Sequence, residues 1–104
     1  MLIRNLYPLF PGIDPGRFTI NYQMNDLWVS VPRNNARITL IFHSKSFDML
    51  CRPIILTQEK TEIAQTKGLI YQDQVLTKNN NDLANLSSSI PEFLALIDYL
   101  TKTQ

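Results

Sequence analysis

FTINYQMNDLWVSVPRNNARITLIFH, residues 18–43, alternates apolar and polar side chains in three short segments. Alternation with a period of two is typical of β-strands that bury one face. The links at 24–26 and 32–35 are too short to cross a sheet, so the three strands are expected to be antiparallel neighbours. The three predicted buried sets are Phe18, Ile20 and Tyr22, then Leu27, Val29 and Val31, then Ile38, Leu40 and Phe42.

Beyond this meander the periodic pattern is weaker. Phe47, Leu50 and Cys51 have helical spacing after Ser44, which favours a single helical turn there. The remaining predictions are a short strand at 53–56, a short helix at 57–67, a fifth strand at 68–78 and an exposed loop at 79–82.

A C-terminal helix is predicted over residues 90–102. Ser89 and Glu92 have the spacing of a capping box, and Pro91 suits the first helical turn. An apolar stripe at i, i+3, i+4 and i+7 follows, and it should cover one face of the sheet. It consists of Phe93, Leu96, Ile97 and Leu100.

These elements predict an α+β fold, a mainly antiparallel sheet of five or six strands closed by the C-terminal helix. Several strands followed by one amphipathic helix is also the general plan of pleckstrin-homology-like domains, so a small barrel of that kind is the alternative. With 104 residues, the chain is expected to form a single domain, 1–104. Three prolines and two glycines in residues 7–16 predict that 1–16 is an extended arm.

The composition excludes several classes of chemistry. One Cys and one His leave little material for disulfides or metal sites, and three Gly exclude the glycine-rich phosphate motifs. No cofactor is therefore expected. His43, Asp48 and Cys51 form the best catalytic set available, but a lone Cys is more often a buried apolar residue. We expect no catalytic residues and no enzyme.

The N-terminus lacks the pattern of a signal peptide, and no apolar run is long enough to span a membrane. A cytoplasmic protein without a membrane partner is expected.

Candidate binding residues lie in the first half of the sequence. All five arginines fall within residues 1–52, although the formal net charge is only +1. Trp28 points away from the predicted buried set and could lie near Arg37 on the outer face of the meander, with Arg33 in the adjoining turn. Trp and Arg are frequent anchors at protein interfaces.

The arm is unusually apolar, with Tyr7 and Phe10 as its aromatic residues. It is expected either to fold back on its own domain, which we favour, or to dock on a partner.

The sequence therefore predicts a small non-enzymatic protein-binding module, such as an inhibitor, adaptor or assembly subunit. Its partner would be another protein or a second copy of the chain. Its predicted anchors are Tyr7, Phe10, Trp28, Arg33 and Arg37. The alternative is a domain that binds single-stranded nucleic acid through the outer face of the meander, with bases on the aromatic ring and phosphates on arginine.

Overall fold

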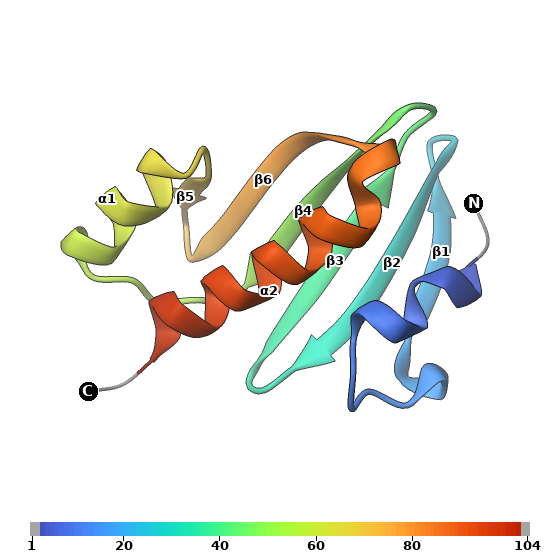
Figure 1. Cartoon of the computed structure of the whole chain (residues 1–104), viewed down its shortest axis with the longest axis horizontal. Coiled ribbons are helices and arrows are strands. Elements are labelled where there is room, and N and C mark those ends of the chain that lie inside the picture. Colours follow the sequence, from blue (N-terminus) through green and yellow to red (C-terminus); the bar gives the residue numbers. More distant parts are fainter. Residues whose placement is uncertain (1–2, 103–104) are drawn as a thin grey trace.

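Six strands form one antiparallel sheet in the computed structural model, which describes residues 3–102. The strand order is β1-β2-β3-β4-β6-β5, and the edge strands β1 and β5 do not meet (Figure 1). The predicted α+β class is confirmed, and the barrel alternative is wrong because the sheet stays open. The strands are β1 (Thr19–Gln23), β2 (Asp26–Arg33), β3 (Ala36–Phe42), β4 (Ser46–Arg52), β5 (Ile70–Gln72) and β6 (Val75–Asp82).

Helix α2 (Leu86–Thr101) crosses one face of this sheet, as Figure 1 shows. Its buried residues Ile90, Phe93, Leu94, Ile97 and Leu100 join one apolar core with the inward side chains of the strands. The shorter helix α1 (Gln58–Thr66) lies beside β5 and buries Ala64.

The register of the meander confirms the predicted alternation for β2 and β3. Val29 pairs with Leu40, and Leu40 pairs with Met49 of β4, so these side chains point to the same face, beneath α2. In β1 the alternation also holds, because Ile20 pairs with Val29 and Tyr22 with Leu27. The predicted burial fails there for two of the three residues: Phe18 is buried, but Ile20 is 44% exposed and Tyr22 is 75% exposed. β1 is an edge strand, and side chains there have neighbours on one side only.

The segment 44–50 is not a helical turn. His43 N–H donates to the Ser46 carbonyl in a tight turn at 2.9 Å, and the chain returns as β4. Every second side chain of β4 is buried: Phe47, Met49 and Cys51. A strand forms here rather than a helical turn, because β3 provides backbone hydrogen-bond partners along its length.

The segment 53–56 is a loop and not a strand. The hydroxyl of Tyr71 holds it by donating to the carbonyl of Ile54 at 2.7 Å and accepting from the N–H of Leu56 at 3.2 Å. The predicted fifth strand at 68–78 is a hairpin instead, in which Asp73 and Gln74 both have positive φ and turn β5 into β6. The predicted helix at 57–67 is confirmed as α1.

The predicted loop at 79–82 is the irregular end of β6. The side-chain amide of Asn81 is buried and donates to the carbonyls of Phe47 and Lys78, at 2.9 and 2.8 Å. Asn80 has a positive φ of 59°, which asparagine tolerates better than most residues, and its N–H donates to Asp48. Side-chain hydrogen bonds thus replace ladder bonds where the register shifts.

Helix α2 begins earlier than predicted. A 3-10 turn, Leu83–Asn85, leads directly into Leu86, and Asp82 accepts a hydrogen bond from the N–H of Ala84 at 2.9 Å. Ser89 and Pro91 therefore lie inside the helix, and the predicted capping box is not formed. The early start is favoured by burial, since Ile90 is only 1% exposed in the core.

The N-terminal arm folds back, as favoured, but it is not extended. Residues 1 and 2 of the predicted arm lie outside the described part of the chain; the rest forms the 3-10 turns Ile3–Asn5, Tyr7–Leu9 and Pro15–Arg17. Leu6 and Phe10 are fully buried, and the arm packs on the same side of the sheet as α2 (Figure 1).

Candidate binding surface

The side of the sheet opposite α2 and the arm is covered by no other element of residues 3–102. We call this side the open face. The register of the strands arranges the side chains of the open face in rows that run across the strands, and the rows differ in charge and polarity. One end of the face is acidic, the centre is apolar and hydroxylated, and the other end is basic.

The centre of the open face combines three half-buried apolar side chains, Trp28, Ile41 and Leu50. Trp28 lies directly opposite Ile41, and Leu50 belongs to the next row, opposite Thr39. The indole Nε1 of Trp28 is buried and has no hydrogen-bond partner among the described residues. An unmet donor of this kind costs on the order of 1–3 kcal/mol. The centre is therefore an apolar surface with one unsatisfied hydrogen-bond donor.

The basic end is formed by Arg37 on β3 and Arg52 on β4, which are directly opposite in the antiparallel register. Both are exposed, and neither guanidinium forms an ion pair with any described acidic side chain. Like charges directly opposite in a sheet are destabilising, by up to about 1 kcal/mol. The free protein thus retains an unfavourable arrangement that an anion would relieve.

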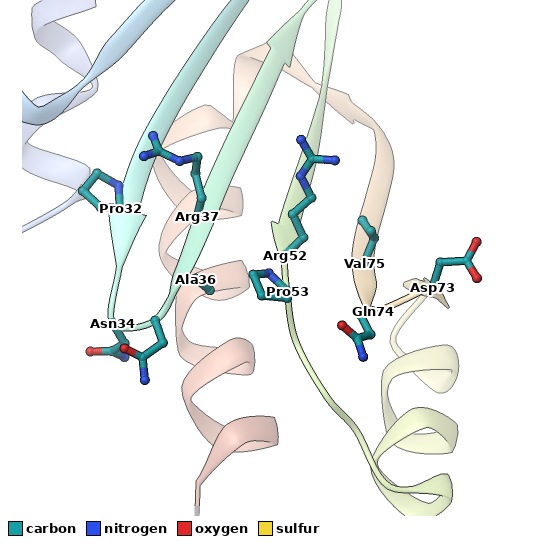
Figure 2. A pocket seen from close by; sticks show the side chains of 10 residues that line it. Pro32, Asn34, Ala36, Arg37, Arg52, Pro53, Asp73, Gln74 and Val75 are labelled. Carbon is teal, nitrogen blue, oxygen red and sulfur yellow. The ribbon is translucent and has the colours of Figure 1, made fainter.

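A hollow of about 660 Å³ lies at this end of the sheet. Pro32, Arg37 and Arg52 line one side, and Asp73 and Val75 line the other. Figure 2 shows the two arginine side chains on neighbouring strands, with the guanidinium of Arg37 turned toward Pro32 and away from Arg52, while the carboxylate of Asp73 points away from both. The hollow is therefore bordered by two cations, each of which can bind a carboxylate or phosphate oxygen.

The acidic end is centred on His43. Its Nε2 lies 3.0 Å from Asp48 Oδ2, and its Nδ1 lies 3.1 Å from Asp26 Oδ1. Hydrogen bonds to Asp48 and then to Asp26 raise the pKa of His43 above its ordinary value of 6.5. The two carboxylates approach opposite sides of the ring and do not converge on one point. Within residues 3–102 no group of three or more His, Cys, Asp or Glu side chains is placed to hold a metal ion.

Two of the five predicted anchors, Trp28 and Arg37, occupy the open face. Pro32, the partner of Arg37, comes four residues after Trp28 on β2, so the two anchors are about 13 Å apart along the strands. Arg33 does not join them, because it turns to the helix side and pairs with Asp98 of α2 at 2.6 Å.

The arm anchors are not at a free surface. Phe10 is 1% exposed, and Tyr7 is half-buried. Both rings pack edge-on against Phe18, with centroid distances of 5.6 Å for Phe10 and 4.9 Å for Tyr7. The aromatic residues of the arm therefore complete the core in this conformation.

Leu50 and Arg52 were missed as residues of the outer face, because the sequence interpretation made 44–50 helical. The alternation Phe47, Met49, Cys51 was the available signal, since it leaves Asp48, Leu50 and Arg52 on the outer face.

The catalytic set considered for the sequence is divided between the two faces. His43 and Asp48 meet on the open face, whereas Cys51 is 1% exposed beneath α2. Burial raises the pKa of the Cys51 thiol to about 11, which disfavours the nucleophilic thiolate.

Comparisons with models of known protein families, with curated proteins and with solved structures found no match. None of the helices in the described part of the chain is long and apolar enough to cross a membrane. Fold and surface together define an α+β protein whose sheet has one covered face and one open face.

Proposed function

We propose that this chain is a non-enzymatic protein-binding module and that its open face binds an acidic segment of another protein. The observation that carries the proposal is the pair Arg37 and Arg52, held side by side without an acidic partner. Each guanidinium offers parallel N–H donors that match a carboxylate. A bound anion would also remove the repulsion between them.

The apolar centre supplies the second part of the interface. Trp28, Ile41 and Leu50 provide a rigid apolar surface next to the arginine pair, and interface anchors are commonly aromatic residues and arginine. A fitting partner places an apolar side chain on Trp28 and a carboxylate about 13 Å away, which an extended segment of about four residues can span.

A nucleic acid fits this face less well. Aromatic stacking with arginine contacts is the mode of single-strand binding, and Trp28 with the arginine pair offers both. However, a phosphate chain continuing past Trp28 meets Asp48 and Asp26, and the formal net charge of the chain is only +1. Repulsion at the acidic end therefore favours a protein, whose segment can be acidic at one end only.

Capture from a lysate of the cells that produce the chain provides the first test. The wild type is compared with Arg37→Gln/Arg52→Gln, and with a control, Arg4→Gln/Lys102→Gln, that removes the same charge at two exposed sites elsewhere. Charge-assisted hydrogen bonds contribute about 1.5–3 kcal/mol each, so affinity for the specific partner should fall at least about tenfold in the arginine-pair variant. The control should retain its affinity. Equal capture by both variants would refute the role of the pair.

A titration at two salt concentrations separates the partner classes. A labelled acidic peptide with one aromatic residue and a labelled single-stranded oligonucleotide are each added to the wild type. We expect binding of the peptide only. Binding of the oligonucleotide alone, with affinity falling steeply as salt rises, would favour the nucleic-acid alternative.

A further inference from the structure

The outer edge of β1 has no strand beside it within residues 3–102. β2 pairs with all five residues of β1 along one edge only, and every β1 side chain is exposed. The backbone groups of the outer edge can therefore accept another strand.

β1 carries none of the features that normally protect an edge strand. Its sequence, TINYQ, contains no charged residue and no proline, and its register with β2 has no bulge. The opposite edge strand, β5, has only three residues and contacts α1. The two edges therefore differ, and only β1 offers a regular template.

We propose that β1 pairs antiparallel with β1 of a second copy of this chain, around a two-fold axis at Asn21. In this register Asn21 faces Asn21 of the second copy, Ile20 faces its Tyr22, and Thr19 faces its Gln23. All five residues of β1 are then paired with β1 of the second copy. If the two-fold axis lay instead at Ile20 or Tyr22, only three residues of β1 in each copy would be paired.

The side chains of β1 are complementary to themselves in this register. Ile20 and Tyr22 share the helix side of the sheet, so the axis brings together two pairs of a β-branched and an aromatic residue, a favourable cross-strand combination. Thr19, Asn21 and Gln23 share the open face and meet as neutral polar pairs that can exchange hydrogen bonds. No apolar residue faces a polar one.

Charges at the two ends of β1 support the same arrangement. Arg17 comes two residues before the strand, and Asp26 pairs with Gln23 at its far end. Antiparallel pairing brings Arg17 of each copy next to the hairpin that carries Asp26 of the other. Opposite charges therefore approach each other at both ends of the interface.

The interface is small, because it rests on one short strand per copy. Interfaces below about 1,200 Å² are typical of transient complexes, so we expect a dissociation constant in the micromolar range. The two-fold axis is perpendicular to the sheet, so both open faces lie on one side of a twelve-stranded sheet. Two copies would then present two Arg37–Arg52 pairs to one partner.

Cysteine cross-linking tests the register. Asn21→Cys should form a disulfide-linked dimer under mild oxidation, because the introduced thiols meet at the axis. Thr19→Cys and Gln23→Cys should each stay uncrosslinked alone and link when mixed. The native Cys51 adds little background, because it is 1% exposed. Efficient linkage of Thr19→Cys to itself, or none by Asn21→Cys, would overturn the proposed register.

Sedimentation of the full chain tests the association without cross-linking. The wild type should dimerise with a midpoint in the micromolar range, and Ile20→Lys/Tyr22→Lys should be monomeric because like charges face each other across the axis. Ile55→Lys is the matched control, since Ile55 is an exposed isoleucine away from β1, at 79% exposure. It should dimerise like the wild type. A wild type that stays monomeric at about 1 mM would overturn the proposal. Circular dichroism confirms that each variant is folded.

Discussion

Replacing Phe10 with alanine tests whether the N-terminal arm is part of the core. The ring is 1% exposed and packs edge-on against Phe18, with centroids 5.6 Å apart at 85°. Truncating a buried Phe to Ala costs about 3–5 kcal/mol, which includes the cavity left behind. A domain of this size has a total unfolding free energy of about 5–15 kcal/mol, so the loss is a large share of it.

Equilibrium unfolding in urea, followed by circular dichroism, measures this loss. We expect Phe10→Ala to lower the unfolding free energy by about 3–5 kcal/mol, and Asn5→Ala, an exposed substitution in the same arm, to change it by less than about 0.5 kcal/mol. A double-mutant cycle of Phe10→Ala with Phe18→Ala should give a coupling of about 0.5–1.5 kcal/mol for the aromatic pair. A loss below about 1 kcal/mol for Phe10→Ala would refute the assignment of the arm to the core.

Two further predictions concern the acidic end and the irregular strand end. Asp48 and Asp26 raise the pKa of His43, so its contribution to stability is full below pH 6.5 and is lost as pH rises through the higher pKa of the folded state. Wild type should therefore be more stable than His43→Gln at about pH 5.5, by a margin that narrows toward about pH 9; a widening margin would contradict this. Asn81→Ala removes one buried and one partly buried hydrogen bond and should lower the unfolding free energy by about 1–3 kcal/mol, whereas Asn79→Ala, at an exposed position, should change it little. Equal effects of the two substitutions would contradict the role of the Asn81 amide.

The meander could be predicted because its hydrophobic period and its short links agree. In β2 and β3 every second residue is apolar, and the two-residue turn at 34–35 permits no other topology. The stripe from Phe93 to Leu100 likewise identified α2, because a period of 3.6 over two turns has no strand interpretation.

Two of the errors share a physical cause, since they occur where side-chain hydrogen bonds replace those of a regular backbone ladder. Asn81 supplies hydrogen bonds that a regular ladder would supply, and Tyr71 holds a loop that lacks a strand partner. The contacts of Tyr71 with Ile54 and of Asn81 with Phe47 join residues 17 and 34 positions apart, and no local pattern reports them.

The candidate surface could be predicted only in part, because the pairing of strands that are distant in sequence leaves no local pattern. Trp28 and Arg37 follow from alternation within the meander, but the neighbour of Arg37 is set by the register of β3 with β4. A pairing between residues 37 and 52 becomes visible only when the strand at 46–52 is assigned. Arg33 was misplaced because it pairs with Asp98 of α2, 65 positions away, and Phe10 was misplaced because the arm that carries it folds onto the core.

Fluorescence of Trp28 during titration with the purified partner tests the central claim most directly. Trp28 is the only tryptophan of the chain and lies at the centre of the open face, so its emission reports on that surface alone. We predict a saturable change in its emission that matches the affinity measured by calorimetry, and a weaker affinity for Arg37→Gln/Arg52→Gln. Binding seen by calorimetry without any change in Trp28 emission, and equally tight in the arginine-pair variant, would show that the partner binds elsewhere.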